Sequence, residues 1–277
     1  MPTGPYDHLI DFFDEFAPNY EQWAGGLHPR VAAKLVELAA PQKGESALDV
    51  GTGTGLVANA VAQAVGKRGQ AIGIDVSEGM MRIGRAAKPP VAEFIGMAGE
   101  RVVFRDGTFD LVTFGDVLTY LADPAAALGE AARVLRPGGR VALSVPRRAL
   151  HTSGQDRFFE VLEDFLERHP LRIPRVAGRD RIRFGEPELL TDILETFGFE
   201  GVQTSTLMTG WRLQGGRAWI EHMLGAGPFT HATLSALGAR LRDELAGELD
   251  VAMGELGEEG QRAHHAYTLA IAHPRRQ

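Results

Sequence analysis

The chain has 277 residues, and its content of 44% hydrophobic and 23% charged residues is typical of a globular protein rather than of a disordered or fibrous one. A formal net charge of −7 disfavours a nucleic-acid partner, and the absence of cysteine excludes disulfides, thiolate nucleophiles and cysteine-ligated metal sites. There is no recognisable signal peptide and no run of about 18 apolar residues, so we expect a cytoplasmic protein without a membrane span.

Two helices are expected at the N-terminus, where apolar residues recur at helical spacing. The first is predicted over 7–20. The second is predicted from about His28 to Ala39, and Pro41 ends it because proline cannot continue a helix.

Strands and helices then alternate as far as residue 145. Short apolar runs predict strands over 46–50, 70–75, 91–95, 109–114 and 141–145. The helices between them are predicted over 56–65, from about Ser77, and from Asp123-Pro124 to the turn Pro137-Gly138-Gly139. Such alternation favours a mainly parallel, doubly wound α/β sheet with helices on both faces.

The regular alternation of short strands and helices ends after Pro146. Helices are predicted over 156–168, 186–197 and 231–253, and two further strands over 201–208 and 266–272 complete a sheet of seven strands. The helices form insertions around the sixth strand. We therefore expect an N-terminal helical lid over 1–40, a cofactor-binding core over 41–150, and a segment over 151–277 that completes the sheet and caps the substrate.

The segment Asp49-Val-Gly51-Thr52-Gly53-Thr-Gly55 follows the first predicted strand and opens a helix. Glycines let the backbone turn tightly and approach a ligand, and a helix N-terminus offers free N–H groups. Asp75 ends the second strand, where a carboxylate can accept from both hydroxyls of an adenosine ribose. Taken singly, the loop could be an ordinary turn and Asp75 a helix cap. Together they favour a nucleoside cofactor.

At this point the sequence resembles the class I S-adenosylmethionine-dependent methyltransferases. The resemblance rests on segments in the family's order, together with looser flanking matches at Phe16-Ala-Pro-Asn-Tyr20 and Phe184-Gly-Glu-Pro-Glu-Leu189 that suggest the small-molecule branch of ubiquinone and menaquinone methyltransferases. The core segments are Ala47-Leu-Asp-Val-Gly-Thr-Gly-Thr-Gly55, Gly73-Ile-Asp-Val-Ser77, Phe109-Asp-Leu-Val-Thr-Phe114 and Leu135-Arg-Pro-Gly-Gly-Arg-Val141.

The resemblance implies a set of cofactor-binding residues for S-adenosylmethionine. Asp49 and the glycine loop would hold the methionine end, Asp75 the ribose, and Tyr20 would cover the cofactor from the lid. Where the family often has an acidic residue for the adenine amino group, this chain has Met97, which would pack on adenine, and Ala98, whose N–H would donate to it. The full set is Tyr20, Asp49, Gly51, Thr52, Gly53, Gly55, Asp75, Val76, Met80, Met97, Ala98, Gly115 and Asp116.

Methyl transfer needs alignment of the reacting atoms and, for a hydroxyl or carbon acid, a general base. Of the nine histidines, His222 lies in the apolar stretch of the second insertion and His151 shortly follows the fifth predicted strand. Both are candidates for catalysis, although a packed or surface histidine is the plainer interpretation of each because neither has a placed partner in the sequence. Thr119 and Tyr120 follow the fourth strand and would touch the acceptor or pack. No metal-binding motif is present, and His264-His265 would face opposite sides of a strand.

Two groups of residues could recognise an acceptor. Trp211, Trp219, Met208, Met223 and Phe229 would line an aromatic pocket or belong to the core, and Arg147, Arg148 and the arginines of 172–183 would bind an acidic group or form a solvated surface.

The function expected is therefore methyl transfer to a small organic acceptor, such as a quinone-like aromatic or a secondary metabolite. Two alternatives stay open. A methyltransferase-fold protein could bind the cofactor but catalyse a reaction such as cyclisation, because a fold does not fix a function. An NAD-dependent oxidoreductase is disfavoured because the loop reads G-x-G-x-G rather than G-x-G-x-x-G. The sequence also leaves a homodimer open.

Overall fold

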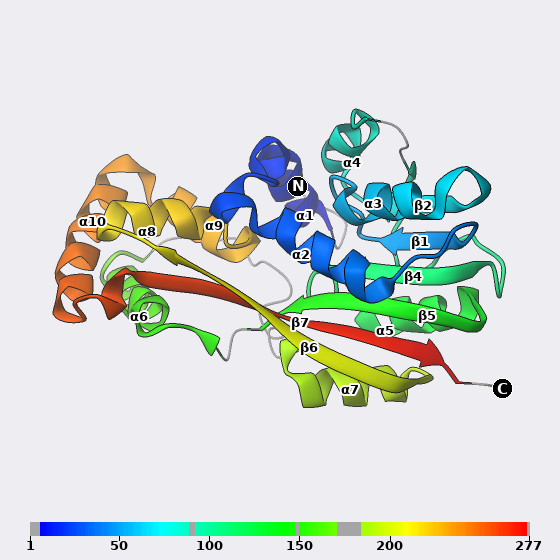
Figure 1. Ribbon diagram of the computed structural model, residues 1–277. Coiled ribbons are helices and arrows are strands. Elements are labelled where there is room, and N and C mark those ends of the chain that lie inside the picture. Colours follow the sequence, from blue (N-terminus) through cyan, green and yellow to red (C-terminus); the bar gives the residue numbers. More distant parts are fainter. Residues whose placement is uncertain (1–5, 89–91, 148–149, 171–183, 276–277) are drawn as a thin grey trace.

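The structure is a computed structural model that describes residues 6–88, 92–147, 150–170 and 184–275. Its centre is one seven-stranded sheet in the order β3-β2-β1-β4-β5-β7-β6 (Figure 1). The strands are β1 (Ser46–Val50), β2 (Gln70–Asp75), β3 (Glu93–Gly96), β4 (Phe109–Gly115), β5 (Leu135–Pro146), β6 (Phe199–Arg212) and β7 (Arg262–Pro274).

The first five strands are parallel, and β7 runs antiparallel to both β5 and β6. The sheet is therefore mixed but mainly parallel, which confirms the expected fold class. Its strand order reverses between β1 and β4, so a crevice opens at the carboxyl ends of these two strands, where open α/β sheets bind ligands.

Helices cover both faces of the sheet. One face packs against α2 (Trp23–Ala39) and α3 (Leu56–Val65), and the other against α5 (Pro124–Val134) and α7 (Pro187–Thr196) (Figure 1). Helix α4 (Glu78–Arg85) follows β2, and α1 (Asp7–Phe16) with the 3-10 turn Ala17–Asn19 lies against α4. Helices α4 and α5 start where the sequence predicts. At each start an N-cap side chain, that of Ser77 or Asp123, accepts from a backbone N–H of the first helical turn.

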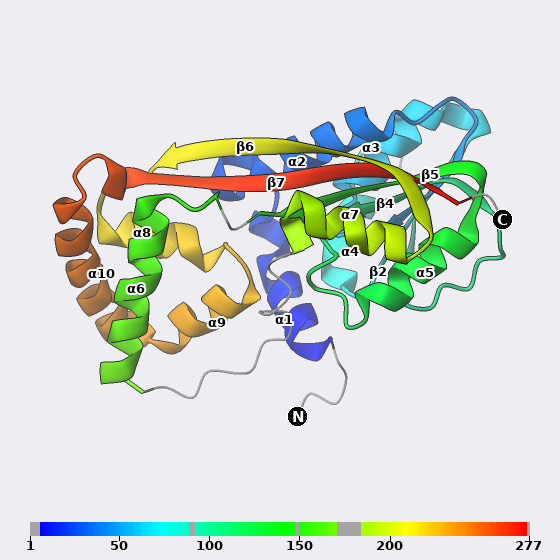
Figure 2. The same cartoon turned by 90° about the horizontal axis from the view of Figure 1, so that it is seen from below.

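A second hydrophobic core lies apart from the sheet. It is formed by α6 (Ser153–Arg168), α8 (Gly215–Leu224) and α10 (Gly238–Glu255), with Trp219, Phe158 and Phe165 fully buried at its centre. Together with α9 (Pro228–Ala236), these helices gather at one end of the molecule (Figure 2). We call this group, α6 and α8–α10, the helical cap.

Some helix boundaries differ from the sequence-based predictions and others are close to them. The first helix, expected over 7–20, ends at Phe16 and is followed by a 3-10 turn. The helix expected over 231–253 is two helices, because Gly238 has a left-handed backbone with φ of +68° that interrupts the leucine stripe. The helix expected to reach Pro137 ends at Val134, and β5 starts at Leu135, which pairs with Phe109 across a register shift. Helix α2 has left-handed residues at 24–26, so regular helix begins at Leu27, close to the predicted start.

The last two strands are much longer than expected. β5 pairs with β7 only as far as Pro146 and Tyr267, whereas β7 continues to pair with β6 through Arg262 and Arg212. The two strands therefore leave the sheet as a two-stranded ribbon that reaches the helical cap (Figures 1 and 2). Among the described residues, no helix is long and apolar enough to cross a membrane.

Candidate active site

Two adjoining cavities lie at the carboxyl ends of the parallel strands. The first, which we call the glycine-loop cavity, is enclosed by the loop after β1, the ends of β2 and β4, and the lid helix α1. Ten of the thirteen residues expected to bind the cofactor border it: Tyr20, Gly51, Gly53, Asp75, Val76, Met80, Met97, Ala98, Gly115 and Asp116.

The glycine loop has a shape that other residues could not adopt. Gly51 and Gly55 have φ angles of +67° and +76°. A Cβ atom at Gly51 would lie 2.2 Å from Cγ2 of Val117, and one at Gly55 would lie 2.6 Å from Cζ of Phe94. The loop therefore needs glycine for backbone conformation and for close packing, and Gly51 and Gly53 border the cavity.

Asp75 connects the glycine loop with the start of α4. One carboxylate oxygen accepts from the N–H of Gly53 and the other from the N–H of Ser77, both at 2.8 Å. Burial raises its pKa, and these hydrogen bonds oppose the shift. Because each oxygen has a second lone pair, the carboxylate can still accept two hydroxyl groups from a ligand.

Asp49, Thr52 and Gly55 do not border the cavity. The Asp49 carboxylate accepts from the hydroxyls of Thr52 at 2.7 Å and Thr113 at 2.6 Å. Burial raises the pKa of Asp49 to about 6, against the effect of these hydrogen bonds. In this arrangement the three residues shape and brace the loop from beneath.

The lid is attached to the cavity rim. The side chain of Asp14 on α1 accepts from the hydroxyl of Ser77 and from the N–H of Gly79, at the N-terminus of α4. Tyr6, which borders the same cavity, donates to the carboxylate of Glu100. Helix α1 thus closes over the glycine-loop cavity.

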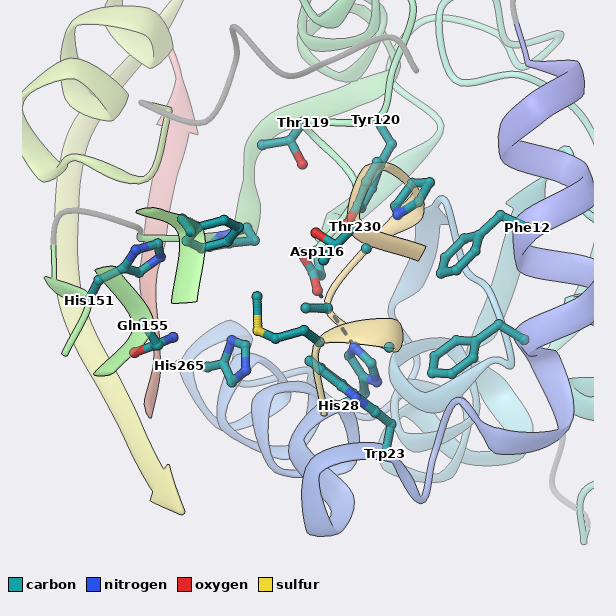
Figure 3. Close-up of a pocket in the computed structure, with 18 of the residues that line it drawn as sticks. Phe12, Trp23, His28, Asp116, Thr119, Tyr120, His151, Gln155, Thr230 and His265 are labelled. Carbon is teal, nitrogen blue, oxygen red and sulfur yellow. Dashed lines mark ion pairs between the residues drawn. The ribbon is translucent and has the colours of Figure 1, made fainter. Parts of the chain in front are cut away.

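The second cavity, which we call the large cavity, has a volume of about 750 Å³ and lies between the lid, α2 and the helical cap. Its walls carry many aromatic side chains, with polar groups from β7 and α6 at one side (Figure 3). Aromatic side chains on its wall are Phe12, Phe13, Phe16, Tyr20, Trp23, Tyr120, Phe159 and Tyr267. A planar apolar ligand suits such a lining.

Asp116 borders both cavities, at the point where they meet. It follows β4 in a left-handed conformation with φ of +54°, and its side chain is only 12% exposed. Its Oδ2 accepts from the hydroxyl of Tyr267 at 2.9 Å, and its Oδ1 is buried without a hydrogen-bond partner in the described structure. Burial raises its pKa to about 7, against the hydrogen bond from Tyr267. This oxygen is therefore an acceptor that a donor group of a bound ligand can satisfy.

The two histidines expected to act in catalysis lie in different surroundings. His151 borders the large cavity on the side away from Phe12 (Figure 3), and its Nδ1 is 3.5 Å from Asp156. His222 is 8% exposed and lies behind the wall, where its Nε2 is 3.0 Å from Nε2 of His265. Burial lowers the pKa of His222 to about 4 and that of His265 to about 3, so both rings are neutral at pH 7 and one donates to the other.

Sequence reasoning missed His28 and Tyr267. The Nδ1 of His28 donates to the carbonyl of Tyr20 at 2.8 Å, and the Tyr20 ring stacks on the imidazole with 3.8 Å between ring centroids. Its Nε2 lies 4.0 Å from Oδ2 of Asp116, as the dashed line in Figure 3 marks. Nothing in the sequence pairs residues 28, 116 and 267, because they come together only through the sheet order and the packing of α2 on the sheet.

The proposed acceptor-recognition residues divide between wall and core. Met223, Thr119 and Tyr120 border the large cavity, whereas Trp219 is fully buried in the cap and Met208 is 57% exposed on β6. Trp211 packs on His222 and His265. The side chain of Phe229 lies outside the described set.

Arg147 borders the large cavity and pairs with Glu186 at 3.3 Å. Arg148 and residues 172–183 lie outside the described residues. Within the described ranges, no three His, Cys, Asp or Glu side chains are grouped so as to hold a metal ion.

Known proteins resemble this chain over its core and beyond. A family profile described as a methyltransferase domain matches residues 48–143. A ubiquinone/menaquinone biosynthesis C-methyltransferase of Geobacter sulfurreducens is 32% identical over 207 residues, which cover 70% of this chain and 77% of that protein. The nocamycin O-methyltransferase of Saccharothrix syringae is 32% identical over 206 residues, covering 69% and 72%. The crystal structure of the [4+2]-cyclase SpnF matches with a TM-score of 0.56 and 19% identity, covering 98% and 94%.

Proposed function

Because this chain belongs to the class I S-adenosylmethionine-dependent methyltransferases, we propose that it methylates a small aromatic acceptor, of the quinone-like or secondary-metabolite kind, bound in the large cavity. The family assignment makes it an S-adenosylmethionine-dependent enzyme that acts on a small molecule. The observation that carries the finer proposal is the junction of the two cavities at Asp116. A cofactor in one cavity and an aromatic acceptor in the other would meet there, as in-line transfer requires.

The residues around the glycine-loop cavity fit the cofactor. Asp75 would accept from the ribose hydroxyls, and the unpartnered Oδ1 of Asp116 would accept from the methionine ammonium. The backbone of Gly51 and Gly53 would approach the methionine end closely because neither residue has a side chain, with Asp49, Thr52 and Gly55 bracing the loop. The adenine would lie among Val76, Met80 and Met97, near the N–H of Ala98, with Tyr20 closing the site. When bound, the cofactor supplies a methyl group made electrophilic by its sulfonium.

The chain's own contribution is to bind the acceptor, orient it and exclude water. In this scheme residues 1–40 form the lid, residues 41–150 bind the cofactor, and residues 151–277 complete the sheet and cap the acceptor. His151 would bind the end of the acceptor far from the junction, since it lies on that side of the cavity. His222 would act through His265, holding that ring at the cavity wall.

Two measurements test the proposal. Calorimetric titration with S-adenosylmethionine and S-adenosylhomocysteine should give micromolar binding, with NADH as the negative control. Incubation with S-adenosylmethionine and a panel of hydroxylated naphthalenes and naphthoquinones should then form S-adenosylhomocysteine in an acceptor-dependent manner. Binding of both nucleosides without methylation of any aromatic acceptor would overturn the acceptor class and favour a reaction such as cyclisation. Absence of nucleoside binding would overturn the cofactor site.

A further inference from the structure

We propose that His28 accepts the proton from a hydroxyl group of the acceptor, so that the enzyme is an O-methyltransferase with a histidine base supplied by α2. This inference rests on the function proposed above and assigns the position of methylation. It starts from four imidazoles on the wall of the large cavity in the described structure, namely His28, His151, His264 and His265.

His28 is the one imidazole of these four with a nitrogen within 4.0 Å of an Asp116 oxygen in the described structure. Asp116 marks the junction of the cavities, where the methyl group must pass from one ligand to the other. A base at this position reaches the acceptor atom that receives the methyl group. His151 and Gln155 lie on another side of the cavity, toward β7 and α6 (Figure 3).

The hydrogen bonds of His28 fix its tautomer. A carbonyl oxygen can only accept, so the 2.8 Å contact with Tyr20 places the proton on Nδ1. The lone pair of the neutral ring is therefore on Nε2, the nitrogen that points toward Asp116. The parallel stacking of the Tyr20 ring, with 3° between the planes, holds the imidazole in this orientation.

The surroundings keep His28 neutral until it receives a proton. The residue is 9% exposed, and burial lowers its pKa to about 4, against the hydrogen bond to Tyr20. The Nε2 atom of His28 has no hydrogen-bond donor among the described residues, and the Asp116 carboxyl lies 4.0 Å from it. A carboxylate at 4.0 Å would stabilise the imidazolium that forms when the ring accepts a proton.

Nε2 of His28 therefore demands a donor from the acceptor molecule. It is an acceptor, and the Tyr267 hydroxyl near it already donates to Oδ2 of Asp116 in the described structure. An aromatic hydroxyl can satisfy Nε2, whereas a carbonyl or an ether oxygen cannot. The aromatic walls on either side would hold the ring that carries the hydroxyl.

The proposed step is balanced. The acceptor O–H bond breaks and its proton moves to Nε2 of His28, while the oxygen forms a bond to the methyl carbon. The carbon–sulfur bond breaks and its electron pair stays on sulfur, which becomes the neutral thioether of S-adenosylhomocysteine. The proton on His28 leaves to solvent after the products dissociate.

The matched variant is His28→Asn, because an asparagine amide can replace Nδ1 as the donor to the Tyr20 carbonyl but has no basic nitrogen at Nε2. The control is His273→Asn. The Nδ1 of His273 also contacts a backbone carbonyl, that of Gly139 at 2.9 Å, but it lies at the exposed far end of β7. Two measurements verify that both variants are folded. Thermal unfolding should be cooperative, as in the wild type, and the affinity for S-adenosylhomocysteine should match that of the wild type within twofold.

The first readout is binding rather than activity. In the complex with S-adenosylhomocysteine, calorimetry should show that the wild type binds 2-naphthol about tenfold more tightly than 2-methoxynaphthalene, since only the naphthol can donate to Nε2. In His28→Asn this preference should disappear, and in His273→Asn it should persist. Equal preference in the wild type and His28→Asn, or no binding of 2-naphthol to the wild type, would overturn the proposal.

The second readout is the dependence of the rate on acceptor acidity. With 2-naphthol, kcat of His28→Asn should fall by about 100-fold or more, with KM for S-adenosylmethionine unchanged. With 2-hydroxy-1,4-naphthoquinone, which is already ionised at pH 8, the loss should be below tenfold. Equal losses with the two acceptors would mean that His28 only positions the site. Full activity in His28→Asn would refute the role of His28 as the base and leave the methyltransferase assignment intact. An inactive wild type that does not bind S-adenosylhomocysteine would instead refute the proposed function itself.

Discussion

Replacing Asp116 by asparagine should stabilise the unliganded protein at pH 8 and weaken the binding of the cofactor. The carboxyl group is buried with one oxygen that lacks a partner in the described structure, so its ionised form is disfavoured in the folded state. Asparagine tolerates the left-handed backbone at this position and keeps an oxygen for the Tyr267 hydroxyl. The substitution therefore removes the charge with little change in shape.

The magnitude follows from the pKa of Asp116, which burial raises from 3.8 to about 7. Well below pH 3.8 the carboxyl is protonated in both the folded and unfolded states, so it has no effect on the free energy of unfolding there, and at pH 4 the effect is still small. As the pH rises, the unfolded chain releases the proton first, and the folded state loses relative stability until the pH passes about 7. A shift of three units corresponds to about 4 kcal/mol, which Asp116→Asn should restore at pH 8 but not at pH 4.

Asp116→Asn should also weaken cofactor binding. Loss of a charge-assisted hydrogen bond to the ammonium should lower the affinity by about 1.5–3 kcal/mol. Urea unfolding at pH 4, 6 and 8 and calorimetry with S-adenosylhomocysteine measure the two effects. Asp110→Asn is the matched control. Partial burial of Asp110 is outweighed by hydrogen bonds from Ser46 and Arg136, which lower its pKa, so this variant should lose stability above pH 4. A stability difference for Asp116→Asn that is the same at pH 4 and pH 8 would refute the reasoning.

Three further substitutions test the glycine-loop cavity and the buried histidines. Asp75→Ala should weaken S-adenosylhomocysteine binding by about 1–3 kcal/mol in calorimetry, and an unchanged affinity would contradict the ribose assignment. Gly55→Ala should destabilise the protein by about 1–3 kcal/mol in urea unfolding because its Cβ would meet the ring of Phe94, whereas Gly129→Ala, in an open helical position, should be neutral or stabilising. Burial lowers the pKa of His265 from 6.5 to about 3, so the wild type should lose stability as the pH falls below 6.5; His265→Phe should reduce the loss between pH 7.5 and pH 5 by about 2 kcal/mol, and equal losses would contradict a buried neutral ring.

The cofactor half of the site was predictable because its signals are local in sequence. The boundaries of β1, α3 and β2 match the prediction residue for residue, since buried apolar runs are separated there by glycine turns and an acid. Ligand-facing groups in such a unit follow the strand ends directly. Ten of the expected cofactor residues consequently border one cavity, although their contacts with the cofactor stay a prediction.

The acceptor half was not predictable because its residues come together only through the fold. His28 precedes the sheet, Asp116 follows β4, and Tyr267 lies on β7. The contacts of Asp116 with His28 and Tyr267 span 88 and 151 positions in sequence. The polar, exposed residues of β6 also hide its length, because an edge strand with one solvated face lacks a strong apolar run. The expected strand over 201–208 therefore missed the ribbon that reaches the cap.

The ribbon of β6 and β7 connects the sheet, with its glycine loop, to the helical cap that borders the large cavity. Tyr267 is the last β7 residue to pair with β5, through Pro146, and it is also the residue that donates to Asp116. Beyond it, β7 pairs with β6 alone and leads to the helical cap, whose own core is separate from that of the sheet. Changes in the cap can therefore reshape the large cavity while leaving β1, β2 and the glycine loop undisturbed. In the proposed function, acceptor specificity and cofactor binding would thus be encoded in separate packing units, whose cavities share Asp116 on their walls.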